Sequence, residues 1–176
     1  NRIFVMPKPT LDNAISIGDP LLSDNYELVF DSLPSEITDA TEAFRMQCRS
    51  VNKPGLTIAE VLVQVFGHTV RHAGQNTVTG SMNVGFVENS ELSVYTVLEE
   101  WVNFCRDHKT QLGGFKDEYA VNATLRIFKQ DGSTAAEYRI KGVWPKTAPE
   151  LAFEGTGSNA LQYDAEFSFD DYNKVA

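Results

Sequence analysis

Short runs in which apolar and polar residues alternate fill most of the chain from residue 26 onward. The clearest run places Leu161, Tyr163, Ala165, Phe167 and Phe169 between polar neighbours. Because successive side chains of a β-strand point to opposite faces of a sheet, this period of two indicates strands with one buried face. Alternating or β-branched runs also occupy residues 26–30, 43–51, 58–70, 76–87, 121–129 and 136–143. The chain is therefore predicted to be mainly β.

Turn residues indicate how these strands pair. Asp131-Gly132 separates residues 121–129 from 136–143, and an Asp-Gly pair supplies the positive φ angles of a tight hairpin turn. A second hairpin is predicted to join residues 58–70 to residues 76–87 through a turn at residues 72–75. Lys53-Pro54-Gly55 is predicted to end the strand at residues 43–51.

One segment has a clear helical period. Its apolar residues recur at i, i+4, i+7, i+8 and i+11, and they are Val94, Leu98, Trp101, Val102 and Cys105. We expect a helix over residues 91–108, capped by Asn89 or Ser90. Short strands with a single helix favour two packed antiparallel sheets, as a sandwich or barrel, with that α-helix packed on them.

The length of 176 residues favours one main domain. Residues 1–24 contain Pro7, Pro9, Gly18 and Pro20 without sustained periodicity, which predicts an extended amino-terminal arm. Residues 25–176 then form the β domain. We find no targeting segment and no stretch suited to a bilayer, so we expect no membrane association and synthesis in the cytoplasm.

The charge is acidic overall but uneven. With 15 Lys and Arg against 24 Asp and Glu, the net charge is −9, which excludes a long-range basic field for duplex nucleic acid. Residues 88–119 carry 3 basic and 7 acidic side chains, whereas residues 126–146 carry 5 basic and 2 acidic ones. Opposite charges on two surfaces suit a head-to-tail contact between copies, with Arg126, Arg139 and Lys141 in the interface. The alternative is an ordinary solvated surface of mixed sign.

The sequence contains little that indicates catalysis. Cys48 and Cys105 are expected to be reduced, buried and structural. His68 and His72 are four residues apart, but they lie in a β-rich run without a third ligand in register. Nucleophile-elbow and dinucleotide-binding patterns are also missing. We expect no enzyme activity, no cofactor and no metal. Aromatic and basic residues of the late hairpin leave single-strand nucleic-acid binding as a weaker alternative, because the net charge opposes it.

Three stretches occur in a recognisable order. Residues 44–55 form a strand that closes in a Pro-Gly turn, and residues 80–89 lead through a short turn into the helix with Trp101. The late hairpin then ends in Val143-Trp144-Pro145, followed by the closing strand within residues 165–172. In order and spacing these stretches resemble the tail tube proteins of contractile-tailed bacteriophages, over about residues 26–172.

The resemblance implies a structural virion protein. In that family two packed sheets with one helix assemble into hexameric rings, and the rings stack into a hollow tube inside a contractile sheath. The partners would be further copies, the sheath, baseplate and tail terminator proteins, with assembly in the host cytoplasm. Genomic DNA would pass through the lumen without specific binding, since an acidic lumen repels phosphate. We assign to the lumen Thr77, Thr79, Ser81, Asn83, Asp164 and Glu166.

Two other functions remain open from the sequence. A type VI secretion tube has the same ring architecture with effectors as its cargo. A small-ligand binding β-barrel would instead be monomeric and enclose an apolar cavity.

Overall fold

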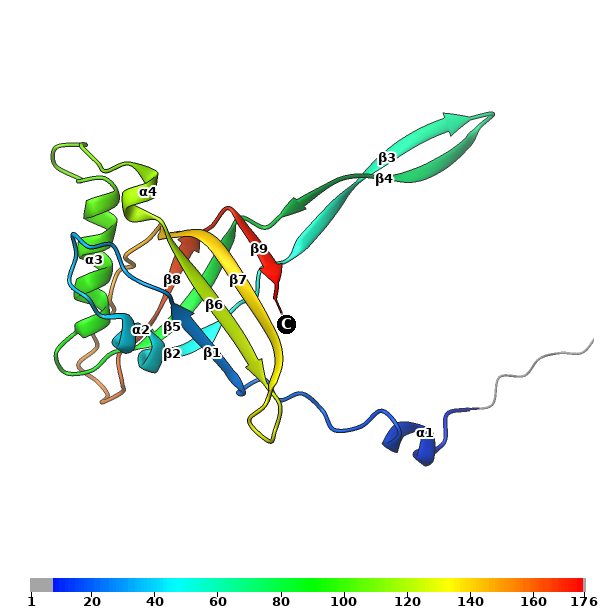
Figure 1. Cartoon of the computed structure of the whole chain (residues 1–176), viewed down its shortest axis with the longest axis horizontal. Helices are drawn as coiled ribbons and strands as arrows, with labels where there is room; N and C mark the ends of the chain where they lie inside the picture. Colours follow the sequence, from blue (N-terminus) through cyan, green and yellow to red (C-terminus); the bar gives the residue numbers. More distant parts are fainter. Residues whose placement is uncertain (1–7, 176) are drawn as a thin grey trace, which may run out of the picture.

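The computed structural model describes residues 8–175 of the chain, and strands dominate this part (Figure 1). The strands are β1 (Tyr26–Phe30), β2 (Cys48–Val51), β3 (Leu56–Val65), β4 (His68–Val78), β5 (Ser81–Val87), β6 (Val121–Phe128), β7 (Thr134–Pro145), β8 (Gln162–Ser168) and β9 (Asp171–Lys174). The helices are α1 (Leu11–Ile15), α2 (Thr41–Gln47), α3 (Ser93–Cys105) and α4 (Lys116–Tyr119). The prediction of a mainly β chain is confirmed.

Two antiparallel sheets form the body, and β7 belongs to both. The first sheet contains β1, β6, most of β7 and β9, and the second contains β2, β5 and β8. Gly142 of β7 has a φ of +70°, which suits glycine; Val143 still pairs with β6, and Trp144 and Pro145 then pair with β8 of the second sheet. The predicted hairpin at Asp131-Gly132 is confirmed as β6 and β7.

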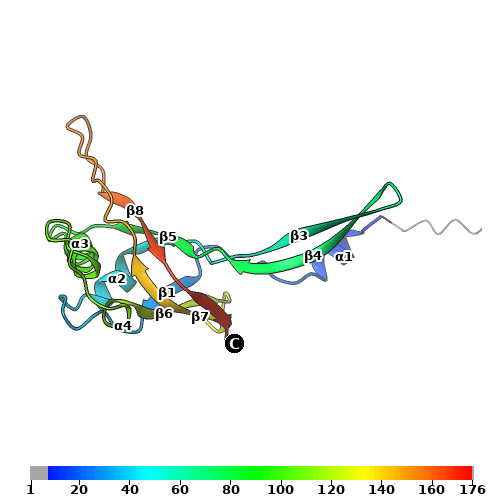
Figure 2. The same cartoon turned by 90° about the horizontal axis from the view of Figure 1, so that it is seen from above.

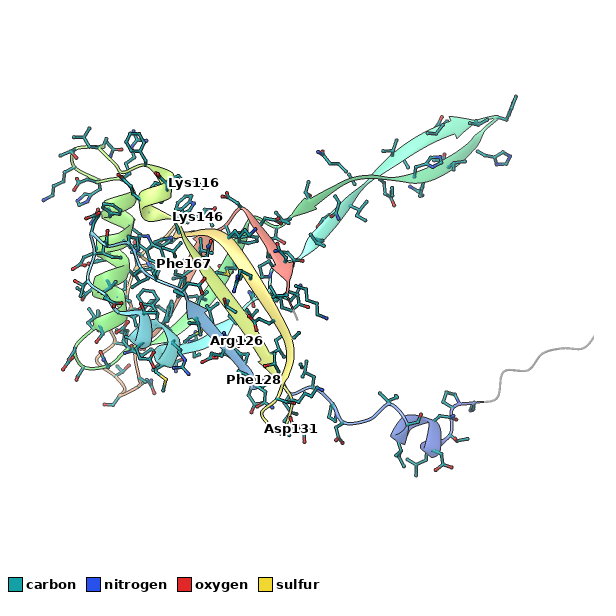
Figure 3. The ribbon with its side chains drawn as sticks, viewed as in Figure 1. Lys116, Arg126, Phe128, Asp131, Lys146 and Phe167 are labelled. Atoms are coloured by element: carbon teal, nitrogen blue, oxygen red, sulfur yellow. The ribbon has the colours of Figure 1, made fainter. Side chains whose placement is uncertain are left out.

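Aromatic side chains join the two sheets and α3. The Trp101 ring centroid on α3 lies 5.9 Å from that of Phe30 on β1 and 6.0 Å from that of Phe167 on β8. Phe44 on α2 stacks edge-on against Phe30 at 5.5 Å and against Phe86 on β5 at 5.4 Å. All five side chains are at most 1% exposed. The body therefore has one continuous core (Figure 3).

The α3 helix confirms the predicted apolar face, but it is shorter than predicted. Val94, Leu98 and Trp101 are buried, and the Trp101 Nε1–H donates to the Tyr119 carbonyl at 2.8 Å. The N-cap position is Leu92, which has a φ of +55°, rather than the predicted Asn89 or Ser90. Asn89 Oδ1 nevertheless accepts from the Ser93 N–H at 3.2 Å, so its side chain still satisfies a helix donor.

The prediction of a strand over residues 43–51 is wrong in its first half. Residues 41–47 form α2, and only Cys48–Val51 forms a strand. Alternation placed Phe44 and Met46 on the same buried face, yet Phe44 is 1% exposed and Met46 is 72% exposed. From residue 40 to residue 47 the buried or half-buried positions are 40, 41, 43, 44 and 47, which fit a helical period. Over seven residues both periods fit, and packing of Phe44 into the core decides between them.

The prediction for the second hairpin has the wrong turn. β3 and β4 turn at Phe66-Gly67, where both residues have positive φ, and not at residues 72–75. Gly74 lies inside β4 at a shift of register, and a Cβ there would meet the Ala59 carbonyl oxygen at 2.8 Å. The glycine therefore marks a bulge, a role that glycine in a strand shares with turns. The predicted strand at residues 76–87 is correspondingly divided at Gly80 between β4 and β5.

Two extensions leave the body on the side away from α3 (Figures 1 and 2). The β3–β4 hairpin is a separate two-stranded sheet. The predicted amino-terminal arm contains α1, and its first seven residues lie outside the described residues. Within residues 8–175, no helix has the length and apolar character that crossing a bilayer requires.

Both cysteines are free and half-buried. Burial raises the pKa of the Cys48 thiol to about 11 and that of Cys105 to about 12. Both thiols are therefore neutral near pH 7, as expected of packing residues rather than nucleophiles.

Replacing Trp101 by Phe is expected to lower the free energy of unfolding by about 2 kcal/mol, because the Tyr119 carbonyl loses its donor and a cavity opens. Thermal unfolding should fall by about 4–8 °C for a chain of this size. Phe153→Leu is the control, since Phe153 is 79% exposed. Equal shifts for the two variants would contradict this account of the core.

Iodoacetamide at pH 8 is expected to modify the cysteines of the folded protein at least about tenfold more slowly than those of the urea-unfolded chain, because the thiolate is the reactive form. Mass spectrometry of time points measures both rates. Because burial raises both thiol pKa values from 9.0, the thiols contribute fully to the stability of the folded state below pH 9. This contribution to stability is lost as the pH rises toward the pKa of about 11 for Cys48 and about 12 for Cys105. Equal rates in the two states would show that burial does not control the thiols.

Candidate assembly surfaces

The β3–β4 hairpin carries eight of the eighteen large apolar side chains that are exposed in the described part of the chain. Four of them share one face, here called the valine face: Val61, Val63, Val65 and Val70, which are 41–48% exposed. Figure 3 shows the hairpin side chains standing clear of the body on both sides of the ribbon. Strands with both faces exposed and apolar side chains on them are typical of surfaces that another protein covers.

The tip of the hairpin has an unusual residue. Phe66 has a φ of +50° and is 98% exposed. Turns of this kind favour Asn, Asp or Gly, because a bulky side chain strains the left-handed backbone. A strained, fully exposed phenyl ring does nothing for the stability of the isolated chain, which points to a contact outside it.

The amino-terminal arm is a second apolar extension. Leu11, Ile15 and Ile17 in and after α1 are 66–85% exposed, and Leu21 and Leu22 are 58% and 42% exposed. With the hairpin, the arm accounts for thirteen of the eighteen exposed apolar side chains. The apolar surface is thus concentrated on the parts that leave the body.

The structure brings together only part of the predicted lumen set. Asn83 on β5 pairs in register with Glu166 on β8, and Asp164 lies one pair further along the same outer face of the second sheet. Ser81 is half-buried and is the first residue of β5. Thr77 and Thr79 lie elsewhere, at the base of the hairpin.

The carboxylates of this outer face are paired within the chain. Arg49 Nη2 lies 3.1 Å from an Asp164 oxygen, and Lys146 Nζ lies 3.0 Å from Glu166 Oε1. Two cations therefore balance two carboxylates. This pairing makes the face polar and close to neutral, rather than strongly acidic.

The predicted interface cations differ in their surroundings. Arg126 on β6 forms ion pairs with Glu27 and Glu137 at 3.4 and 3.6 Å (Figure 3). Arg139 and Lys141 on β7 are exposed, and neither takes part in an ion pair formed by residues 8–175. The latter two keep their charge available to another molecule.

An acidic hollow lies beside α2 and α3. It has a volume of about 600 Å³ between α2 and α3, and its acidic lining residues are Asp39, Glu42, Glu91 and Glu100. Glu100 is partly engaged, because its Oε2 accepts from the Thr38 N–H at 3.1 Å. The uneven charge of the sequence thus becomes an acidic surface near α3 and exposed cations on the first sheet.

The half-buried Glu88 also lies near α3, and its hydrogen bonds are structural. Its Oε1 accepts from the Tyr163 hydroxyl at 2.5 Å and from the Tyr95 N–H of α3 at 2.9 Å. Burial, together with Glu88, raises the pKa of Tyr163. Among residues 8–175 no group of three metal-ligating side chains occurs, and His68 and His72 lie on the valine face.

Sequence reasoning missed the exposure of the hairpin and the conformation of its tip. Alternation places Val61, Val63 and Val65 on one face of a strand, as observed, but it does not indicate whether anything covers that face. The sequence feature that could have indicated an exposed hairpin is the presence of apolar residues on both faces of residues 56–66. The face opposite the valines mixes Leu62 with Glu60, Gln64 and Arg71, so each face of the hairpin exposes apolar side chains among polar ones.

Comparison with known proteins agrees with this architecture. A family model described as phage tail tube protein matches residues 15–175. The tail tube proteins gp19 of Enterobacteria phages T6 and T4 are each 23% identical to this chain over 129 residues, which are 72% of this chain and 78% of theirs.

Solved structures show the same fold. A chain of the anti-feeding prophage baseplate has a TM-score of 0.63 at 14% identity, with 90% of this chain and 97% of that one covered. A chain of the sheath-tube complex of an extracellular contractile injection system in its extended state has a TM-score of 0.60 at 13% identity, with 96% and 99% covered. The chain belongs to the phage tail tube protein family.

Proposed function

We propose that this chain forms the inner tube of a contractile tail, as hexameric rings stacked into a hollow conduit for DNA inside a contractile sheath. The observation that carries the proposal is the β3–β4 hairpin, whose apolar side chains are exposed on both faces. The membership of the chain in the tail tube family supports the same conclusion.

The hairpin needs a partner for physical reasons. Two strands alone are marginally stable in water, and their open edges present unpaired backbone groups to any neighbouring strand. Burying the exposed remainder of each apolar side chain contributes on the order of 1 kcal/mol, so eight contribute on the order of 8 kcal/mol per hairpin. Association costs roughly 4–15 kcal/mol. One contact is thus barely sufficient, and a closed ring, which makes all its contacts together, is favoured.

Charge is proposed to orient the copies. Arg139 and Lys141 on the first sheet would face the acidic surface near α3 of a neighbouring copy, in a head-to-tail contact whose two sides differ. Arg126 lies on the same sheet, but Glu27 and Glu137 already balance its charge, so its contribution to the contact is smaller.

The lumen is proposed to include Ser81, Asn83, Asp164 and Glu166 on the second sheet, with Thr77 and Thr79 at its margin. Arg49 and Lys146 are held in ion pairs with Asp164 and Glu166 on this face, which weakens their attraction for phosphate, and the net charge of −9 per chain repels phosphate at longer range. DNA would therefore pass without specific binding.

The remaining partners follow from the same role. The solved relatives come from a sheath-tube complex, a baseplate and a tube-terminating cap, which supports a sheath, a baseplate and a terminator as partners here. We place the protein in the virion, assembled in the host cytoplasm. It acts as a structural component and not as an enzyme. The aromatic core fills the space that a ligand-binding barrel would leave open, so that alternative is disfavoured.

Negative-stain electron microscopy over a concentration series tests the proposal, with rings or hollow tubes as the expected result. The double variant Arg139→Glu/Lys141→Glu should reduce tube yield at least about tenfold while thermal unfolding stays within about 2 °C, because both side chains are exposed and unpaired within the chain. Lys109→Glu, a charge reversal in the loop after α3, is the control. Uniform small particles of the unsubstituted protein at every concentration would contradict the proposed tube.

The variant Phe66→Asn separates assembly from folding at the hairpin tip. Asn adopts positive φ more readily than Phe, so the melting temperature of the unassembled protein should be equal or higher. Tube formation, followed by sedimentation, should fall because the exposed ring is lost. A variant that assembles normally would show that Phe66 makes no contact between copies.

A further inference from the structure

The base of the β3–β4 hairpin holds a lysine between two tyrosine rings. Lys53 Nζ lies 4.6 Å from the centroid of the Tyr138 ring and 4.7 Å from that of the Tyr172 ring. Both distances are within the range of cation–π attraction. Its ammonium group also donates to the Pro54 carbonyl at 2.9 Å, and none of the ion pairs formed by residues 8–175 includes it.

This contact crosses from one sheet to the other. Lys53 follows β2 of the second sheet and precedes β3 of the hairpin, whereas Tyr138 on β7 and Tyr172 on β9 belong to the first sheet. The two rings lie 6.1 Å apart, at 62° to each other, so the ammonium contacts both. The lysine therefore braces the point at which the hairpin leaves the body against the opposite sheet.

Other contacts at the base act differently. Thr79 N–H donates to the Gly55 carbonyl at 3.1 Å, and Gly55 N–H donates to Thr79 Oγ1 at 3.1 Å. These bonds join the two hairpin strands to each other and leave their direction free. On the returning strand, the Phe169 N–H donates to the Gly80 carbonyl at 3.1 Å. On the segment that leads into β3, the Asn52 N–H donates to the Asn83 carbonyl of β5 at 3.1 Å, and the side chain of Lys53 adds a contact to the first sheet.

The length of the hairpin makes its direction sensitive to the base. The ten residues of β3 span about 33 Å at about 3.3 Å per residue, so a rotation of about 10° at the base moves the tip by about 6 Å. A displacement of that size is larger than the spacing between neighbouring strands, about 4.8 Å. An extension that must meet a fixed surface on another copy needs a restrained base.

We infer that Lys53, Tyr138 and Tyr172 form a clamp that sets the direction of the β3–β4 hairpin, with Lys53 as a positioning residue for assembly. The clamp makes the docking of β9 on β7 part of the same restraint, because β9 supplies Tyr172. The purpose assigned to the clamp rests on the proposed tube function. The clamp itself is a property of the single chain, and it is measurable before any assembly.

Pulsed electron spin resonance on dilute, unassembled protein measures the direction of the hairpin. Nitroxide labels are attached at Gln64→Cys near the tip and at Asn122→Cys on β6, in a background with Cys48→Ala and Cys105→Ala. The width of the distance distribution between the labels reports how freely the hairpin swings. Thermal unfolding of each labelled protein verifies that the body remains folded.

Lys53→Met should broaden this distribution at least about twofold, whereas Lys53→Arg should keep the original width, since a guanidinium also stacks on aromatic faces. Tyr172→Leu and Tyr172→Phe form a second pair, in which Leu removes the ring and Phe retains it. Lys109→Met is the control for loss of charge. An unchanged width for both Lys53→Met and Tyr172→Leu would overturn the clamp.

Assembly assays then separate the clamp from the tube. If the clamp and the tube are both correct, Lys53→Met lowers tube yield and Lys53→Arg restores it. If Lys53→Met broadens the distribution while the parent protein forms no tubes at any concentration, the clamp stands and the proposed function fails. If tubes form but the widths are unchanged, the proposed function stands and the clamp fails.

Discussion

Five aromatic side chains from both sheets and two helices determine the architecture of the body. Trp101 and Phe44 bring α3 and α2 into contact with Phe30 on the first sheet, while Phe167 and Phe86 complete the cluster from the second. Edge-to-face contacts of this kind depend on ring orientation as well as on burial, so they fix how the layers are placed. Because the core already buries the large apolar side chains of the body, most of the exposed ones in the described part of the chain lie on the hairpin and the amino-terminal arm.

Much of the fold was predictable because apolar and polar residues alternate in the strands that cover the core. β6, β7 and β8 follow their patterns closely, and Asp131-Gly132 marks its turn without ambiguity. The errors came where a local pattern has two physical solutions. Seven residues around Phe44 fit a strand or a helix, and packing selected the helix. Gly74 fits a turn or a bulge, and the pairing of β3 with β4 selected the bulge. β9 was missed because four residues are too few to show a period.

The assembly surfaces were less predictable than the fold, since exposure is decided by what lies opposite a strand. Sequence patterns indicate which residues share a face, but the valine face has the same pattern as a buried one. For the predicted cations, the sequence could not distinguish Arg126, which Glu27 and Glu137 neutralise, from Arg139, which keeps its charge available. Asp164 and Glu166 were expected to line an acidic lumen, yet Arg49 of β2 and Lys146, the residue after β7, balance their charges. That role in the lumen stays a prediction.

The sharing of β7 between the two sheets has a consequence for how the molecule loses structure. Neither sheet can detach without breaking pairs of the same twelve-residue strand, so the two sheets and the helices packed on them form one cooperative unit. The β3–β4 hairpin is a separate two-stranded sheet, so we expect its amides to open to solvent before those of the body. We therefore expect one cooperative unfolding transition for the body and a separate, earlier opening of the hairpin.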